Sequence, residues 1–287
     1  MPRFFVTPDD IRGGYVYIGG EDAFHISYSL RMAKGEEICV CDGTGKEYRA
    51  SLTDFSDGIV MAKIADSKDS CAEPRIKITL YQAYPKKDKM EFIVQKAVEL
   101  GAVSIVPFES ERCIKRPKEE KADKQTQRLC KIAKEAAKQC GRAIIPQVTR
   151  PCTFEEALKA SMQDDLRLFC YEEGATAATG DEFNGNDAQG ERCAATIGEA
   201  LNGNDIEDGR SACTGHIEPI CDILNSKGAE GVRSVSVFVG SEGGFSPKEA
   251  EIAAKYGCIM CGLGRRILRC ETAPIFALSA LIYRYDL

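Results

Sequence analysis

Hydrophobic and polar positions follow two different patterns along the chain. In the first 70 or so residues, apolar and polar positions alternate in short runs at 3–6, 15–18, 37–41, 48–55 and 58–64. Alternation with period two is typical of half-buried strands. Asp42-Gly43-Thr44-Gly45 lies between two of these runs and is a hairpin signal. Many short strands, with a short helix expected over 23–32, predict a small β-barrel.

From residue 76 onward, apolar runs alternate with helical periods. Strands are expected at 76–83 and 103–106, with a helix between them that begins at an Asp88/Glu91 capping box and ends at Gly101. Strand, helix and strand in succession favour a right-handed βαβ unit. A capped helix start at 153–158 and a strand at 166–171 continue the pattern. We therefore predict an α/β domain with a parallel sheet over 73–287, after a barrel over 1–72.

The last fifty residues contain two strand-loop-helix units. The apolar run 235–239 leads into Gly240-Ser241-Glu242-Gly243-Gly244-Phe245, and then into a helix start at Ser246-Pro247-Lys248-Glu249 that should end at Gly257. The run 258–263 leads into a second loop and the apolar helix 275–283. Because parallel strands place their carboxyl-end loops side by side, both loops should line one ligand crevice.

The first of these loops limits the class of ligand. Three glycines in five residues let the main chain approach a ligand closely. The dinucleotide and P-loop glycine patterns are both missing, however. Glu242 would also repel a phosphate. The loop therefore favours a ligand with hydroxyl groups or a positive charge.

Two stretches together resemble a known family. Gly240-Ser241-Glu242-Gly243-Gly244-Phe245-Ser246 and Leu263-Gly264-Arg265-Arg266-Ile267-Leu268-Arg269-Cys270-Glu271-Thr272-Ala273 are similar to the signature of the RsmE family. These are SPOUT-class methyltransferases that methylate N3 of a uridine in 16S ribosomal RNA with S-adenosylmethionine. Ser241 stands where the family usually has Pro, and Cys270 where it often has Thr. We expect these changes to alter loop rigidity more than chemistry.

The resemblance implies more than the pattern alone can give. It implies a PUA-like RNA-binding barrel, a deep trefoil knot over 237–282, and a homodimer in which 275–283 is buried near the site. The partner is 16S ribosomal RNA, within the small ribosomal subunit. The resemblance implies that the adenosyl ligand lies on Cys170, Tyr171, Val239, Gly240, Ser241, Glu242, Gly243, Gly244, Leu263, Gly264, Ile267, Leu268 and Thr272.

The reaction itself indicates catalytic candidates. N3 of neutral uridine carries a proton and is a poor nucleophile, so arginines aimed at the uracil oxygens would favour the deprotonated base. Arg266 and Arg269 are the candidates for this role. Glu242 or Glu271 would hold ribose hydroxyls or balance the sulfonium. The alternative for Glu271-Thr272 is an N-terminal cap of the last helix, and we assign no general base.

Five residues are candidates for RNA contact, namely Arg3, His25, Arg31, Arg112 and Arg142. Arginine matches phosphates and base edges. Three of them have a structural alternative. For His25 it is a half-buried histidine, for Arg112 a surface ion pair with Glu109 or Glu111, and for Arg142 the compensation of a helix C-terminus.

Charge and cysteine content refine this interpretation. The net charge is −6, yet 112–150 holds twelve Lys or Arg against four Asp or Glu. That segment is either a focused RNA contact or the solvated face of a helix. Fourteen cysteines without regular spacing suggest reduced thiols in the cytoplasm. Cys258 and Cys261 are expected on opposite faces of a strand, and with two histidines in the chain we predict no metal site.

Residues 174–231 lose periodicity, and 172–231 hold thirteen Asp or Glu against three Lys or Arg. We expect an extended acidic insertion with a short helix near 217–224. No apolar run is long enough for a membrane span. Two competing functions remain open, a non-catalytic RNA-binding module and a SPOUT methyltransferase that acts on another RNA position.

Overall fold

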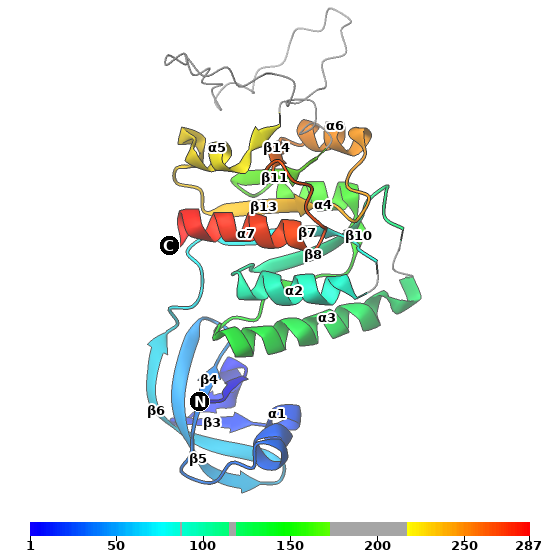
Figure 1. Ribbon diagram of the computed structural model, residues 1–287. Helices are drawn as coiled ribbons and strands as arrows, with labels where there is room; N and C mark the ends of the chain where they lie inside the picture. Colours follow the sequence, from blue (N-terminus) through cyan, green and yellow to red (C-terminus); the bar gives the residue numbers. More distant parts are fainter. Residues whose placement is uncertain (87, 115–118, 173–216) are drawn as a thin grey trace, which may run out of the picture.

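The computed structural model describes residues 1–86, 88–114, 119–172 and 217–287, which form two sheets with helices around the second (Figure 1). The first sheet has the order β1-β4-β5-β6-β3-β2. Only β1 and β4 pair in parallel. Its strands are β1 (Arg3–Phe5), β2 (Ile11–Arg12), β3 (Tyr15–Ile18), β4 (Glu37–Cys41), β5 (Lys46–Ser56) and β6 (Ile59–Asp69). The five predicted strands are confirmed, but this order does not close among the described residues, so the expected barrel is a half-barrel.

The alternating pattern works as expected in this half-barrel. Ile38, Val40 and Leu52 are buried in its core, while Cys39 and Cys41 on β4 are buried in a second cluster with Ala143. Its helical segment differs from the expected helix over 23–32. A short α1 (Gly20–Phe24) follows the 3-10 turn η1 (Pro8–Asp10) and β3, and continues directly into the π-helical η2 (His25–Ser29). The inner side of this segment adds Ile26 to the core.

The second sheet contains eight strands, and every pairing in it is parallel. Its order is β10-β8-β7-β13-β11-β14-β12, with β9 also beside β8. The strands are β7 (Lys77–Ala83), β8 (Ser104–Glu109), β9 (Gln147–Val148), β10 (Cys152–Thr153), β11 (Leu166–Cys170), β12 (Glu218–Pro219), β13 (Ser234–Val239) and β14 (Ile259–Gly262). The predicted parallel α/β domain is therefore confirmed.

Helices cover both faces of this sheet (Figure 1). One face carries α2 (Lys89–Glu99), α7 (Thr272–Tyr285) and α5 (Ile220–Asn225), followed by the 3-10 turn η3 (Lys227–Ala229). The other carries α4 (Phe154–Ser161) and α6 (Pro247–Lys255) over a cluster of aromatic rings that includes Phe154, Phe169 and Phe245. The long α3 (Glu119–Cys140) packs on α2 and reaches the half-barrel at β1.

Two of the three predicted capped helix starts are confirmed. The hydroxyls of Thr153 and Ser246 accept a hydrogen bond from the amide of the third helical residue. The carboxylate of that residue accepts a hydrogen bond from the amide of the cap residue. The box at Asp88 is wrong, because its side chain makes no capping hydrogen bond. Glu91 instead pairs with Arg128 of α3 at 2.8 Å. An ion pair between two helices has replaced the predicted local hydrogen bond.

Much of the basic segment is used inside the molecule. Lys134 and Lys138 of α3 each contact Asp22 of the half-barrel at 2.9 Å. Arg142 is 2% exposed; its guanidinium contacts Glu73 at 2.7 Å and donates to the Ala102 carbonyl at 2.6 Å. The lysine contacts join α3 to the half-barrel, and the Arg142 contacts join the end of α3 to the linker at Glu73 and to the loop at Ala102, so this part of the segment stabilises the fold.

Three further expectations concern the rest of the chain. Residues 174–216 of the expected insertion lie outside the described residues, while its short helix is confirmed as α5. The trefoil knot stays a prediction. Cys258 and Cys261 are both buried, and no group of metal ligands is found in the described part of the chain. None of its helices is long and apolar enough to cross a membrane.

We expect Arg142→Met to lower the free energy of unfolding by about 3–5 kcal/mol, because it leaves the Glu73 carboxylate partly buried without its cation. Arg128→Met is the matched control, since the Arg128 side chain is 67% exposed in its pair with Glu91. It should cost about 0–1 kcal/mol. Urea unfolding of both variants measures the difference. Equal losses would show that burial of the Arg142 contacts adds nothing to stability.

Candidate active site

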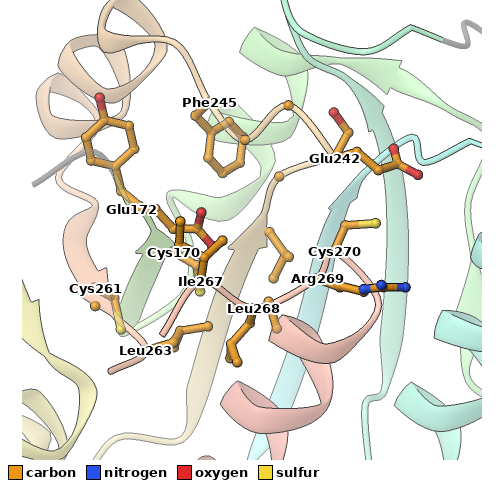
Figure 2. Close-up of a pocket in the computed structure, with 18 of the residues that line it drawn as sticks. Cys170, Glu172, Glu242, Phe245, Cys261, Leu263, Ile267, Leu268, Arg269 and Cys270 are labelled. Atoms are coloured by element: carbon orange, nitrogen blue, oxygen red, sulfur yellow. The ribbon is translucent and has the colours of Figure 1, made fainter. Parts of the chain in front are cut away.

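Three loops meet at the carboxyl ends of β11, β13 and β14 and enclose a cavity of about 660 Å³ (Figure 2). Their strands are neighbours in the sheet, with β11 paired to both β13 and β14. The volume is within the range of small-molecule sites, about 300–1,000 Å³. The crevice expected from the order of the elements is therefore present.

The first loop follows β13 and folds back on itself. The Gly244 amide donates to the Ser241 carbonyl at 3.0 Å, and Gly244 has a φ of +63°. A Cβ on Gly240 would lie 3.0 Å from the Gly244 Cα. Only glycine allows this turn to close so tightly. The turn leaves main-chain groups, rather than side chains, on the cavity wall.

Gln82 of β7 holds the base of this loop. Its side-chain amide donates to the carbonyl of Gly240 at 3.1 Å, and β7 lies beside β13 with Gln82 opposite Val239. Two oxygens under the loop, Oε1 of Gln82 and Oγ of Ser241, are buried and have no hydrogen-bond partner among the described residues. Because buried polar groups are normally paired, these atoms mark a place where a ligand or water completes the site.

Lys89 at the start of α2 ties the two glycine-containing loops together. Its Nζ lies 3.1 Å from a carboxylate oxygen of Glu242 in the first loop and 3.1 Å from one of Glu271 in the second. Hydrogen bonds with Glu271 and Glu242 raise the pKa of Lys89. Burial alone would raise the pKa of both carboxyls, but their hydrogen bonds lower it overall. All three groups are therefore charged at neutral pH.

The second loop brings arginines to the mouth of the cavity. Arg265, Arg266 and Arg269 line it, all are exposed, and their guanidinium groups make no hydrogen bond or ion pair with the described residues. Ile267 lies among them and is 80% exposed. Unpaired cations around a cavity attract an anionic substrate, and each can still form new hydrogen bonds.

The inner wall is apolar and carries protonated thiols. Cys170 and Cys261 are register partners on β11 and β14, and Leu263 and Leu268 lie near them on the same side of the cavity (Figure 2). The hydrogen bond with Cys261, together with burial, raises the pKa of Cys170. Burial, with a hydrogen bond to Glu271, raises the pKa of Cys270 to about 12. These two thiols are therefore not nucleophiles at neutral pH.

Most of the predicted cofactor residues lie together. Twelve of the thirteen line the cavity, and Thr272 does not. Thr272 is the first residue of α7, and its amide donates to the Arg269 carbonyl at 2.8 Å. Glu271 precedes it as the N-cap without a side-chain cap bond, and reaches the site through Lys89 and Cys270. The helix-start alternative therefore describes Thr272 better.

The predicted RNA contacts separate into three groups. His25 and Arg31 are exposed on the half-barrel. Arg112 lines the cavity and donates to the Gly243 carbonyl at 3.1 Å, so it supports the first loop. Arg3 bonds to Glu47 at 3.0 Å, and Arg142 is buried against Glu73. This placement does not favour RNA contact for Arg3 and Arg142, because both guanidinium groups are already engaged inside the chain.

Several site residues escaped the sequence reasoning. Gln82 and Lys89 come from the first βα unit, far from the signature loops. Glu172 lines the cavity directly after Tyr171, and burial raises its pKa. Phe245 closes the first loop onto the aromatic cluster. For Lys89 and Glu172, position after the carboxyl end of β7 or β11 was the signal that could have indicated them.

Comparison with known proteins agrees with this geometry. Residues 72–199 and 208–282 match the RNA methyltransferase domain family, and residues 18–71 match the RNA methyltransferase PUA domain. The chain is 31% identical over 292 residues to ribosomal RNA small subunit methyltransferase E of Bacillus subtilis, covering 100% of this chain and 98% of that protein. The protein of the same name from Synechocystis is 26% identical and covers 97% of this chain and 76% of its own length.

Solved structures give the same relationship. Ribosomal RNA small subunit methyltransferase E of Neisseria gonorrhoeae, bound to S-adenosyl methionine, has a TM-score of 0.73 and 27% identity, with 99% of this chain and 97% of that chain covered. A putative methyltransferase of Legionella pneumophila with bound S-adenosyl methionine has a TM-score of 0.73 and 26% identity, with coverage of 98% and 96%. The chain belongs to the RNA methyltransferase family, with a PUA domain ahead of the methyltransferase domain.

Proposed function

We propose that this protein methylates N3 of a uridine in 16S ribosomal RNA, with S-adenosylmethionine as the methyl donor. The observation that carries the proposal is a cavity with a main-chain floor between three loops and unpaired arginines at its mouth. The family and the names of the relatives supply rRNA of the small subunit as the substrate class. The choice of N3 rests on the resemblance of the two signature loops.

The residues of the cavity suit an adenosyl ligand. The glycine turn offers main-chain groups at close range, and the apolar wall of Leu263 and Leu268 suits a flat base. Two buried oxygens, Oε1 of Gln82 and Oγ of Ser241, can still accept a hydrogen bond from a ligand or a water. Glu242 can accept from ribose hydroxyls or face a positive charge. When bound, the cofactor supplies a methyl group already activated for transfer.

The protein's own task is then to orient the uracil and to favour its deprotonated form. We assign that task to Arg266 and Arg269, whose exposed guanidinium groups can donate to the uracil oxygens. Negative charge that develops on those oxygens is stabilised by donors already in place. Alignment of the attacking nitrogen with the methyl group supplies much of the remaining rate. The high pKa of Cys270 is consistent with direct transfer without a thiolate intermediate.

The two parts of the chain divide the work in this proposal. Residues 1–72 hold the RNA, and residues 73–287 bind the cofactor and carry out the reaction. The chain acts as a homodimer, with α7 at the contact between copies. The outward side of α7 supports this, because Phe276 is 44% exposed and Tyr283 is 77% exposed. The target uracil must be unpaired or flipped out before N3 is reached.

We expect Gly240→Val to abolish binding of S-adenosylmethionine, because the new side chain would meet the Gly244 backbone at 3.0 Å and open the turn. Calorimetric titration measures the affinity. Gly19→Val is the control, since a Cβ there meets nothing within 4 Å. If Gly240→Val binds the cofactor as tightly as the wild type, the cofactor does not lie on this loop.

We expect Arg269→Ala and Arg266→Ala each to lower kcat by about 10²–10³-fold, the usual cost of losing one donor to a developing oxyanion. The affinity for the cofactor should be unchanged. The deficit should shrink toward alkaline pH, where uridine loses its N3 proton without help. Mass spectrometry of nucleosides measures methylated uridine, with Arg150→Ala as a control outside the cavity. A deficit that stays constant with pH would remove these arginines from the deprotonation step.

We expect Lys89→Met to make cofactor binding sensitive to acid. In the wild type the pKa of Glu242 and Glu271 is lowered, so their charged state contributes fully above the ordinary Glu value of about 4.3. It is lost as the pH falls through the lower folded value. Without the lysine both pKa values rise, and cofactor affinity should begin to fall at a higher pH.

Lys86→Met is the matched control for this prediction, because Lys86 contacts Glu242 only through its main-chain amide, at 3.1 Å. Calorimetry at a series of pH values compares the three proteins. Identical pH profiles for all three would mean that Lys89 does not tie the loops together.

A further inference from the structure

Two aromatic rings stack on each other at the surface of the half-barrel. Phe24 at the end of α1 and Tyr28 in η2 have ring centroids 4.6 Å apart and ring planes 29° apart. Phe24 is 61% exposed and Tyr28 is 68% exposed. Large exposed apolar side chains that gather in one place usually mark an interaction site.

The fold does not require this pair. Ala23 and Ile26, on the other side of the same segment, supply its contacts with the half-barrel core. The π-helical turn that begins at His25 carries Tyr28 one turn beyond Phe24, where the two rings meet. Such π-turns are uncommon and occur often at functional sites. The segment therefore displays the pair outward at the expense of regular helix geometry.

An arginine follows the rings in sequence. Arg31 has a φ of +52°, is exposed, and makes no side-chain hydrogen bond or ion pair with the described residues. A left-handed conformation is unfavourable for an arginine, because its Cβ crowds the backbone. His25, between the two rings in sequence, is also exposed. The backbone therefore accepts a small strain at the point where Arg31 turns away from the helix.

The basic helix α3 lies beside the same segment. Asp22 of α1 holds Lys134 and Lys138, and Glu21 approaches Lys131 at 3.5 Å. Lys131 is itself 73% exposed. The helix α1 that carries Phe24 thus also contacts the lysines of α3. Flat aromatic faces next to cations are the combination that binds single-stranded nucleic acid, in which bases stack and phosphates are neutralised.

We propose that Phe24 and Tyr28 form a stacking platform for an unpaired base of the RNA substrate, and that Arg31 contacts a neighbouring phosphate. Because the two rings already cover each other, the base adds to the outer face of the stack. This inference rests on the proposed function, since it names where the half-barrel holds the RNA. The platform lies on the half-barrel, whereas the cavity lies at the edge of the second sheet. It would therefore bind RNA without touching the reacting base.

The test uses the full chain and two RNA probes, a short fluorescein-labelled oligouridylate and purified small-subunit rRNA. Phe24→Leu and Tyr28→Leu keep an apolar side chain but remove the ring. Each should weaken binding on the order of tenfold, the usual loss for one stacked base. Ile59→Ala is the control, because Ile59 is an exposed apolar residue of the same half-barrel, at 44%. It should bind like the wild type.

A second variant reports the stacking directly. The chain contains no Trp, so Tyr28→Trp introduces a single indole that keeps a large aromatic face. It should bind RNA at least as well as the wild type, and its fluorescence should be quenched when RNA is added. Quenching without loss of affinity is a signature that a purely structural role of Tyr28 would not produce.

Two outcomes would overturn the proposal. One is wild-type RNA affinity in both leucine variants together with an unquenched indole. The other is a change in sedimentation of the Tyr28→Leu protein without RNA, which would make the pair a contact between copies of the chain. Cofactor binding and methyl transfer by the wild type are measured in parallel. Their absence would defeat the proposed function, whereas their presence with unchanged RNA affinity would defeat the platform alone.

Discussion

The parallel pairing of β13 with β7 on one side and β11 on the other is the constraint on which the site depends. It sets Val239 beside Gln82, so that the side chain of Gln82 can hold the base of the glycine loop. It also brings the ends of β11 and β14 next to that loop. Because the three strands end on the same edge, the residues that follow them line one cavity. Burial of the strands fixes this register, since a slip by one residue would reverse every side chain.

The features that local chemistry decides could be predicted from the sequence. Apolar runs such as 235–239 can only be strands buried on both faces, and Ser246 with Glu249 forms its cap within one turn. The same reasoning failed at Asp88, where the pattern is equally good. There Glu91 lies within reach of Arg128, a residue of another helix, and the ion pair takes the carboxylate that the cap needs. A local pattern cannot reveal a competitor that only the packing brings near.

The candidate site shows the same limit. Residues of the signature loops were predicted to line the cavity because the loops that follow parallel strands all lie at the carboxyl edge of the sheet. Lys89 was missed because its role depends on two carboxylates, Glu242 and Glu271, more than 150 positions later in the chain. Arg142 was assigned to RNA because its residue type suits RNA. Its guanidinium is buried instead, where Glu73 neutralises it and the carbonyl of Ala102 accepts a hydrogen bond from it.

Pairing, more than the number of charges, distinguishes the cations that support the fold from those left for a substrate. The protein is acidic overall, and its most basic helix gives Lys134 and Lys138 to Asp22 of the half-barrel. The arginines of the second loop, and Arg31 beyond the aromatic pair, make no such contacts within the described residues. A protein with a net negative charge repels RNA at long range, so we expect binding to depend on exposed cations such as these at short range. On the proposed function, such a surface would hold RNA best where base stacking and phosphate contacts are made together, which would favour one RNA site over others.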